Sequence, residues 1–329
     1  MSGGLRIRDM AVTYRSGAGA APVEAVQGVS FALADGEILG LVGESGCGKS
    51  TIARAILGLV PLARGTVEWQ GRRIDTLPKE RFRALRKELQ LVFQDPNACL
   101  DPRMTIAESV AEPLRALMPE FDTGARAARA RERLAEVGLT DALADRYPHQ
   151  LSGGQLQRAV IARALGVDPR LVVCDEPVSA LDVSIQGQIA NLIGRIRRER
   201  GLACLFISHN LAIVARLSER VLVMYRGRIV ESAPRDTLVA SPLHPYTRLL
   251  VDSVPEADPL HARRMLERRR RASARRRDLA SPGCPFVARC PFAVDRCRTL
   301  LPPLRDFSRG HLVACHRADE WRDGLPAER

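Results

Sequence analysis

The chain has 329 residues, 46% of them hydrophobic and 27% charged, which is the composition of a globular protein with room for one large domain and an appendage. Aromatic residues make up only 4%, too few for the stacked platforms that bind single-stranded nucleic acid. No apolar run reaches the 18 residues that would cross a bilayer, and the first residues lack the apolar segment of a secretory signal. A cytosolic location is therefore expected.

The net charge of +12 is concentrated in one tract. Residues 263–277 contain nine Arg and one Glu, which leaves a net +4 for the rest of the chain. Such a run is typical of a solvated linker, with a contact to anionic lipid or to nucleic acid as the alternatives. Because the remaining charge is ordinary, no nucleic-acid partner is expected.

The apolar pattern along the chain predicts an α/β fold. Residues 5–14 alternate between apolar and polar, as a half-buried strand does, and 26–33 predicts a second strand. Short continuous apolar runs predict buried strands at 38–42, 89–93, 171–174, 203–207 and 221–225. Helical patterns lie between several of them, notably at 50–59, 155–166 and 184–199. This alternation is typical of a sheet with parallel strands.

Two stretches depart from that alternation. Residues 101–150 show helical periodicity, for instance at 125–137, without a convincing strand, which predicts a helical insertion in the α/β domain. From about residue 255 the composition changes to Pro, Arg and Cys. We place a domain boundary there.

One loop fits a nucleotide phosphate-binding motif at every fixed position. Residues 43–50 read G-x-x-x-x-G-K-S, directly after the buried strand 38–42 and before a predicted helix. Its glycines let the backbone wrap closely around phosphate oxygens, while N–H groups and the helix N-terminus supply donors. We expect Lys49 to neutralise the phosphates and Ser50 to bind Mg²⁺. The expected nucleotide contacts of this loop are Gly43, Glu44, Ser45, Gly46, Cys47, Gly48, Lys49, Ser50 and Thr51.

Two acids end a predicted strand further along the chain. The apolar run 171–174 is followed by Asp175 and Glu176, so their carboxylates lie at the carboxyl edge of the sheet, where α/β proteins bind ligands. Consecutive side chains on a strand point to opposite faces. We therefore expect Asp175 to hold a hydrated Mg²⁺ and Glu176 to address the attacking water.

A third motif indicates the family. Residues 151–155 (LSGGQ), followed by LQR, resemble the signature of ATP-binding-cassette (ABC) ATPases. Further family motifs follow in the family's order: Gln94 in VFQDP, the segment 179–182 (SALD) and His209 in FISHN. Tyr14 lies upstream, where this family stacks an aromatic ring on adenine. The resemblance covers about residues 5–255.

The resemblance implies a fold, a reaction and a set of site residues. The fold is a P-loop nucleotide-binding domain whose mixed sheet has an antiparallel part and a parallel core, with a helical subdomain. The reaction is ATP hydrolysis with Mg²⁺, in which Glu176 orients or deprotonates water, His209 contacts the γ-phosphate and Gln94 senses metal and water. The implied metal ligands are Ser50, Gln94 and Asp175. The implied nucleotide contacts outside the loop are Tyr14, Ser152, Gly153, Gly154, Gln155 and Asp182.

The resemblance also implies a dimer. In this family the signature of one subunit meets the γ-phosphate held by the phosphate loop of a second, so one chain offers half of each of two sites. ATP then closes the dimer, and hydrolysis lets it open.

Finer motifs resemble one subfamily, the oligopeptide, dipeptide and nickel importer ATPases. They are 97–105, 147–150 and 241–247, while 176–184 looks more like the second of that system's two ATPase subunits. This implies a second ATPase subunit, with a heterodimer favoured over a homodimer, two membrane permease subunits and, indirectly, an extracytoplasmic binding protein. The expected location is peripheral, on the cytoplasmic face of the membrane. The alternatives are the same machinery importing nickel or metal chelates, and a soluble or exporter ABC ATPase.

The expected domains are an ATPase domain at 1–254, with its helical subdomain at about 101–165, an Arg-rich linker at 255–283 and a four-cysteine extension at 284–329. This extension can bury little apolar surface, so we expect a metal or another cross-link to stabilise it. It contains four cysteines: Cys284, Cys290, Cys297 and Cys315. A [4Fe–4S] cluster takes four thiolates, and the resemblance to importer tails favours it; zinc and unliganded thiols are the alternatives. His311 and His316 could substitute as ligands, although surface positions are the simpler expectation. Lying outside every nucleotide motif, the extension is expected to be structural.

Overall fold

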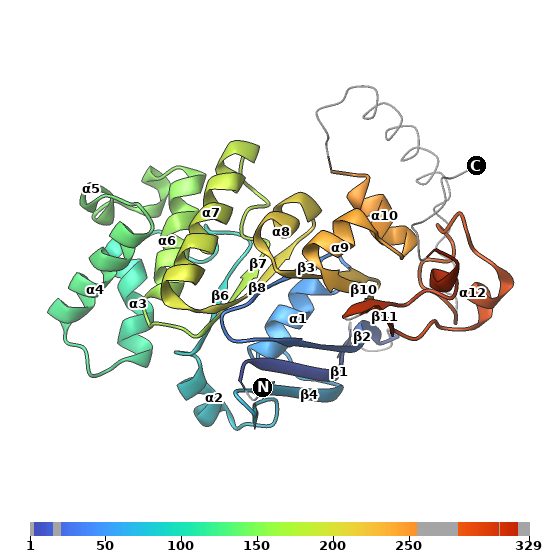
Figure 1. Ribbon diagram of the computed structural model, residues 1–329. Helices are drawn as coiled ribbons and strands as arrows, with labels where there is room; N and C mark the ends of the chain where they lie inside the picture. The colour runs from blue at the N-terminus through green and yellow to red at the C-terminus, as the bar shows by residue number, and fades with distance from the viewer. Residues whose placement is uncertain (1–2, 16–20, 255–281, 309, 322–329) are drawn as a thin grey trace. The chain divides into compact units, whose positions relative to one another are not determined.

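The computed structural model describes residues 3–15, 21–254, 282–308 and 310–321 (Figure 1). The chain divides into two compact units: Met1–Leu39 with Lys49–Ser208, and Gly40–Gly48 with His209–Arg329. The arginine tract 263–277 lies outside the described residues, so its predicted linker role stays a prediction.

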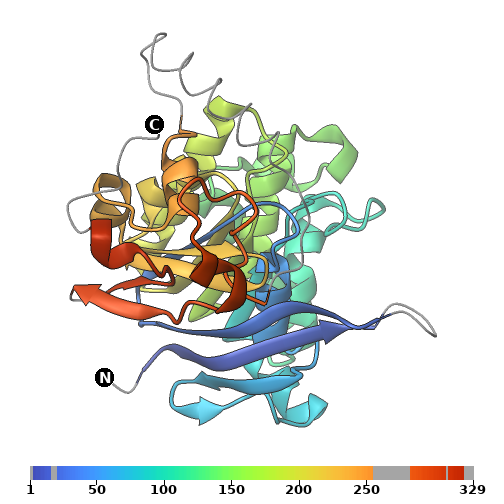
Figure 2. The same ribbon diagram turned by 90° about the vertical axis from the view of Figure 1, so that its right-hand side faces the viewer.

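An antiparallel sheet of four strands opens the first unit. Its order is β2-β1-β4-β5, formed by β2 (Val23–Leu33), β1 (Leu5–Tyr14), β4 (Arg64–Trp69) and β5 (Arg72–Arg73). Figure 2 shows β1 and β2 as two long paired strands. Alternation places Leu5 and Ile7 in the core while Arg6 stays exposed, as predicted for a half-buried strand. The sequence did not predict β4 and β5, which are short and polar.

The same unit holds the parallel strands. β6 (Leu89–Val92), β7 (Leu171–Asp175) and β8 (Ala203–Ser208) lie side by side with β7 in the middle, and every residue of β7 and β8 is buried. β3 (Ile38–Val42) is also buried throughout and runs from the first unit into the second. Continuous apolar runs therefore predicted these strands correctly, because a strand covered on both faces needs no polar side.

Helices accompany these strands. α1 (Lys49–Ile56), α2 (Lys79–Leu85), α6 (Gly153–Leu165) and α7 (Val183–Arg200) belong to the first unit. Three of them were predicted, with ends shifted by one to three residues. α2 was not predicted.

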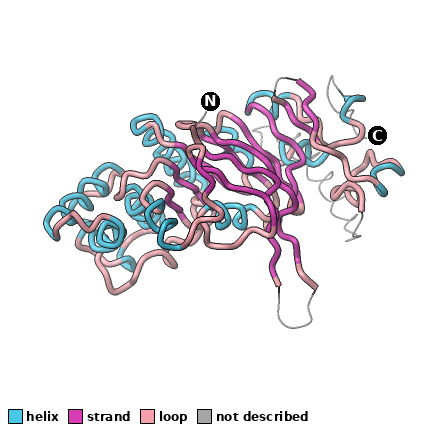
Figure 3. Tube along the Cα trace, turned by 90° about the horizontal axis from the view of Figure 1, so that it is seen from below, coloured by secondary structure: helices cyan, strands magenta, loops and turns pink. Residues whose placement is uncertain are grey.

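The segment predicted to be a helical insertion is helical. It contains α3 (Ile106–Leu117), α4 (Thr123–Glu136), α5 (Asp141–Ala144) and the 3-10 turn η1 (Pro148–Gln150). Thr105 begins α3 with a capping box and Asp122 caps α4, which satisfies N–H groups that a helix start leaves unpaired. α3 packs on both α4 and α6, and Figure 3 shows these helices gathered together.

The second unit contains antiparallel strands. β10 (Arg228–Pro234) pairs with β9 (Arg220–Tyr225) and, on its other edge, with β12 (His311–Val313), which pairs with β11 (Arg305–Ser308). The helices are α8 (Leu211–Leu217), α9 (Arg235–Ala240), α10 (Pro245–Val251), α12 (Asp295–Thr299) and the 3-10 turn η2 (Ala318–Trp321). The C-terminal segment 282–321 thus adds two strands to the sheet of its unit.

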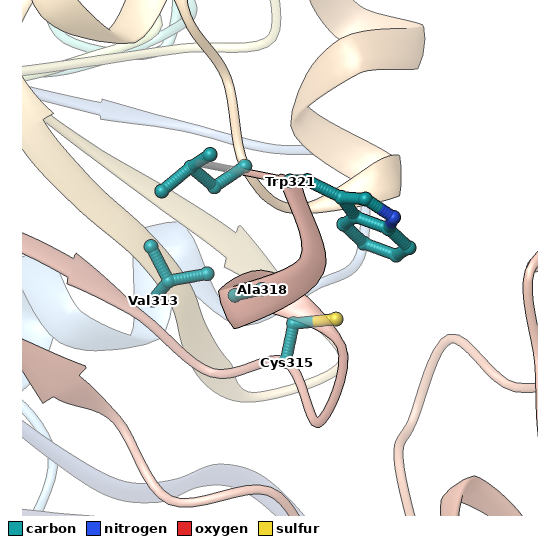
Figure 4. Packing of buried hydrophobic residues seen from close by; sticks show 5 residues of the cluster. Val313, Cys315, Ala318 and Trp321 are labelled. Carbon is teal, nitrogen blue, oxygen red and sulfur yellow. The ribbon is translucent and has the colours of Figure 1, made fainter. Parts of the chain in front are cut away.

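Two contacts hold that segment. The first is an apolar cluster of Leu243, Val313, Cys315, Ala318 and Trp321, most of which Figure 4 shows around one short turn. The second is the fully buried carboxylate of Glu231, which accepts hydrogen bonds from the backbone N–H of Leu243 (2.7 Å) and His244 (2.9 Å) and from Nε2 of His311 (2.7 Å). Three donors satisfy a charge that would otherwise be costly to bury.

Within the described ranges, no helix is both long and apolar enough to cross a membrane.

Candidate functional site

The predicted phosphate-binding loop contains glycines that its backbone requires. Gly46 and Gly48 have φ of +79° and +108°, a region that glycine adopts at no steric cost. A Cβ on Gly43 would lie 2.2 Å from the backbone oxygen of Met224. The phenolic oxygen of Tyr246 accepts the backbone N–H of Glu44 at 2.9 Å, so the second residue of the loop is anchored. The loop 43–48 belongs to the second unit and leads into α1 at Lys49.

In the first unit, the motif residues that the sequence placed far apart lie together. Ser50 Oγ donates to Asp175 Oδ1 at 2.9 Å, joining the start of α1 to the end of β7. Lys49 Nζ lies 3.6 Å from Glu176 Oε1, and both side chains are more than 90% buried. A hydroxyl, two carboxylates and an ammonium group therefore occupy one buried place at the carboxyl end of a parallel strand, where α/β sheets bind ligands.

Glu176 has an unusual backbone conformation. Its φ is +49°, which a residue with a Cβ adopts at a cost of about 1 kcal/mol or more. Its N–H donates to the backbone oxygen of Ile207 on the neighbouring strand at 3.0 Å, so the sheet holds the strained position. Strain of this kind often gathers at functional sites.

Burial changes the acid–base behaviour of Asp175. Removal from water raises the pKa of this carboxyl group, the Ser50 hydrogen bond opposes that rise, and the charge of Glu176 adds to it. The facing hydroxyl of Ser50 and carboxylate of Asp175 are hard oxygen donors, which suit Mg²⁺. A bound cation would favour the ionised form of Asp175 and so oppose this rise, and the residues present therefore fit the predicted metal.

Two further residues predicted for the nucleotide site, Tyr14 and Gln94, each lie at or near the end of a strand of the first unit. Tyr14 ends β1, has 37% of its surface exposed, and its hydroxyl donates to Thr51 Oγ1 in α1 at 3.4 Å. The structure thus brings this ring beside the helix that follows the phosphate loop. Gln94 is exposed two residues after the end of β6. Its metal role stays a prediction.

The signature segment forms a helix start. Ser152 caps α6: its hydroxyl accepts the N–H of Gln155, whose side chain accepts the N–H of Ser152. Ser152 and Gly153 are exposed, and a Cβ on Gly154 would lie 2.8 Å from the Ile185 side chain of α7. The positive end of α6 therefore faces outward and can meet an anion.

Asp182 lies beside that helix start. It is exposed and precedes α7, and its own side chain makes no capping hydrogen bond. Gln186 fixes the turn before it by donating to the backbone oxygens of Val178 (3.1 Å) and Leu181 (3.0 Å). The signature and the 179–182 turn thus present two neighbouring exposed segments. His209, the first residue of the second unit after β8, is exposed as well.

The four C-terminal cysteines line one pocket of the second unit, here called the cysteine pocket, together with His244, Phe286, His316 and Trp321. Burial raises the pKa of Cys284 to about 11 and the pKa values of Cys290 and Cys315 to about 12. All four thiols are free. The sequence therefore identified side chains that the fold gathers around a common space.

The described residues give no direct support for a metal in the cysteine pocket. Among the described residues, no group of three or more His, Cys, Asp or Glu side chains is placed to hold a metal ion. The donor type fits an iron–sulfur cluster or zinc, since both take Cys sulfur, but the thiols must lose their protons first. His311 is buried on Glu231, contrary to the expected surface position. Nε2 of His316 lies 2.8 Å from the backbone oxygen of Leu300.

Sequence reasoning missed two residues at the phosphate loop. Tyr246 holds the backbone of Glu44, and Arg289 holds its side chain through an ion pair of 2.9 Å. Tyr246 lies in the segment 241–247, whose resemblance to the importer ATPases could have pointed to it. Arg289 had none, because its partner is 245 residues away.

Comparison with known proteins gives consistent matches. Residues 26–179 match the ABC transporter family, and residues 230–297 match the oligopeptide/dipeptide transporter C-terminal region. The oligopeptide transport ATP-binding protein OppF of Escherichia coli (strain K12) is 47% identical over 302 residues, which are 90% of this chain and 89% of that protein. The putative oligopeptide transport ATP-binding protein YkfD of Bacillus subtilis (strain 168) is 44% identical over 299 residues, 89% of each chain.

Solved structures agree on the fold. A dimeric post-hydrolysis state of the ATP-binding cassette MJ0796 bound to ADP and Pi superposes with a TM-score of 0.64 at 28% identity, covering 70% of this chain and 98% of that one. The cassette cbiO1 of Clostridium perfringens superposes with a TM-score of 0.65 at 24% identity, covering 73% of this chain and 92% of that one. The mixed-sheet P-loop fold expected from the sequence is thereby confirmed.

Proposed function

Because the chain belongs to the ABC transporter ATP-binding proteins and is an ATP-hydrolysing cassette, we propose that it energises the import of peptides. The names of the relatives indicate the transported substrate. Two are named as oligopeptide transport proteins, one of them putative, and others as putative peptide import ATP-binding proteins. The observation that carries the activity is the buried array of Lys49, Ser50, Asp175 and Glu176 in the first unit. Nickel or metal chelates remain the second candidate cargo, since the motifs at 97–105, 147–150 and 241–247 fit that branch as well.

The residues of the array divide the work of hydrolysis. The loop 43–51 would wrap the ATP phosphates and Lys49 would neutralise them, while Ser50, Gln94 and Asp175 would hold Mg²⁺. Mg²⁺ supplies charge that offsets the developing negative charge on the phosphoryl oxygens. When the phosphates attract Lys49, its 3.6 Å contact with Glu176 weakens, and the carboxylate becomes available to orient water and take its proton. His209 contacts the γ-phosphate, and Tyr14 stacks on adenine.

The exposed segments suit a dimer. The N-terminus of α6 with Ser152, Gly153, Gly154 and Gln155, and the neighbouring Asp182, are open to a second subunit's nucleotide. A second ATPase subunit supplies the matching half, preferably a different chain. Two membrane permeases receive the motion through residues 95–105 and the helical subdomain, and a binding protein delivers the peptide from outside. The chain then works peripherally at the cytoplasmic face of the membrane, with the domain division 1–254, 255–283 and 284–329.

The cysteine pocket is the proposed place of a [4Fe–4S] cluster, with zinc as the alternative. The support is that Cys284, Cys290, Cys297 and Cys315 line one space and are the thiols of the C-terminal segment. Such a cluster would tie together a segment whose regular elements are few and short. Anaerobically purified protein should be brown and contain acid-labile sulfide. Colourless protein with stoichiometric zinc would contradict the cluster, and metal-free protein with an intact fold would contradict both metals.

Reconstitution tests the function as a whole. Proteoliposomes that contain the chain, its partner ATPase and the two membrane permeases should accumulate a labelled oligopeptide when MgATP and the binding protein are present. The variant Glu176→Gln should stop this uptake while nucleotide binding persists. Hydrolysis that never responds to any peptide, but does respond to a nickel chelate, would identify the second cargo instead.

A further inference from the structure

One turn of the C-terminal segment touches both the cysteine pocket and the phosphate-binding loop. Arg289 Nη1 donates to Glu44 Oε2 at 2.9 Å, and Glu44 is the second residue of the loop. Cys290, the next residue after Arg289, lines the cysteine pocket. Both the loop and the turn belong to the second unit. The contact is therefore part of one compact body.

Aromatic rings and backbone hydrogen bonds hold Arg289 in place. Its guanidinium lies over the rings of Tyr225 (5.8 Å) and Phe286 (5.5 Å), and 21% of its side chain is exposed. The N–H groups of Arg289 and Cys290 both donate to the backbone oxygen of Phe286 at 3.0 Å. Burial lowers the pKa of this guanidinium, but Tyr225 and Glu44 outweigh that effect and raise it. Arg289 is thus a fixed, permanent cation, with a planar geometry that lysine does not share.

The same aromatic group anchors the backbone of Glu44. Tyr246, fully buried, accepts the Glu44 N–H, and its ring packs against Tyr225 (4.6 Å between centroids) and Phe286 (5.5 Å). Phe286 comes from the C-terminal segment, between Cys284 and Arg289. One residue of the phosphate loop is therefore held at its N–H and at its carboxylate by side chains that share a single packing cluster.

Electrostatics gives this contact a consequence for ATP. A carboxylate in a loop that wraps phosphates repels them unless a cation pairs with it. We propose that Arg289 is a positioning residue for nucleotide binding, which holds and neutralises Glu44 so that the loop accepts the phosphates. The C-terminal segment then acts on nucleotide affinity directly, beyond the structural role expected from its sequence. The inference rests on the assignment of residues 43–50 to the phosphates.

Binding of a non-hydrolysable ATP analogue with Mg²⁺ to the full chain tests this. Arg289→Ala should weaken binding about three- to tenfold, the range expected for a partly buried ion pair with a stacked guanidinium. Glu44→Gln is made alone and in the Arg289→Ala background, because it removes the carboxylate that needs a partner. The double variant should bind within about twofold of Glu44→Gln alone, and Arg289→Lys should fall between Arg289→Ala and the parent. Arg305→Ala is the matched control, since Arg305 pairs with Asp319 in the same segment.

The other outcomes contradict the proposal. Unchanged binding by Arg289→Ala would exclude the role. If Arg289→Ala binds weakly and Glu44→Gln does not rescue it in the double variant, Arg289 matters only for packing. If the two single variants change binding by equal and opposite amounts that simply add in the double variant, the effect is one of long-range charge. If Arg289→Ala loses its cooperative unfolding transition, Arg289→Gln replaces it in the same comparison. Undiminished binding by Lys49→Ala would instead overturn the assignment of the loop itself.

Discussion

Two buried glutamates, Glu176 in the first unit and Glu231 in the second, differ in the partners of their carboxylates. Glu176 lies 3.6 Å from the ammonium group of Lys49 and sits on a strained backbone with φ of +49°. Glu231 is completely buried and accepts hydrogen bonds from three donors, one of them His311 of the C-terminal segment. The first carboxylate is placed by regular strands and can change partner, whereas the second joins segments that have few regular elements.

This difference teaches how the two regions respond to change. Around Glu176 the strands β7 and β8 and helix α1 are buried by apolar residues, so the fold survives the loss of a polar side chain. In residues 282–321 the strands are three and four residues long, and the buried carboxylate of Glu231 joins one of them to the rest of the unit through His311. Changes at Glu176 should therefore alter chemistry, and changes at Glu231 should alter stability.

The largest effect is expected for Glu176→Gln. Loss of the group that takes a proton from water should lower the hydrolysis rate about 10³-fold, while nucleotide binding and the melting temperature stay near those of the parent. Steady-state phosphate release and calorimetry would measure both. Glu199→Gln, at an exposed position of α7, is the control. Parental turnover by Glu176→Gln would show that another group acts on the water.

Lys49→Ala should follow in size. It removes a buried charge from the phosphates and should weaken MgATP binding about 10- to 100-fold, the range for hydrogen bonds to charged groups. It also leaves Glu176 without its cation at 3.6 Å. Isothermal titration measures the affinity, and Lys79→Ala on the exposed side of α2 is the control. An equal loss in both variants would point to general charge rather than to the loop.

The second region is tested by Glu231→Gln. An amide in place of the carboxylate turns an NH₂ group toward a buried donor, which should lower the free energy of unfolding by about 2 kcal/mol. Urea denaturation followed by tryptophan fluorescence reports it, because Trp321 lies in this segment. Glu320→Gln, whose exposed carboxylate pairs with Arg317, should change stability far less. If Glu231→Gln changed turnover per folded molecule instead of stability, the contrast between the two glutamates would be lost.

The fourth prediction concerns pH. In metal-free protein the folded pKa values of Cys284, Cys290 and Cys315, at about 11 to 12, exceed the ordinary value of 9.0. The folded state therefore binds more protons than the unfolded state above pH 9, so these thiols favour folding below pH 9 and lose that contribution as pH rises toward 12. Unfolding at pH 8 and pH 10 should show a steeper decline for the parent than for a variant with Ser at all three positions. Equal slopes would contradict the burial of these thiols.

Sequence patterns predicted most of the first unit because its signals are local. Strand 38–42, the helix after it and the helical insertion at 101–150 follow from runs of apolar residues and from periodicity within about 15 residues. β5 escaped prediction because it has only two residues, and β4, α2 and β10 because polar residues interrupt their apolar pattern. Sequence reasoning identified Lys49, Ser50, Asp175 and Glu176 through motifs in which each residue stands at a fixed offset from its neighbours.

The sequence by itself therefore determined the order of the elements, the phosphate loop and the chemical types of the site residues. Only the tertiary structure decided which of them meet: Ser50 with Asp175 across 125 residues, and Arg289 with Glu44 across 245. It also decided that the carboxylate of Glu176 leaves a strained backbone position, and that four separated cysteines line one space. The physical reason is that local preferences act between neighbours in the chain, whereas distant pairs form only where burial of the whole core brings their strands and turns together.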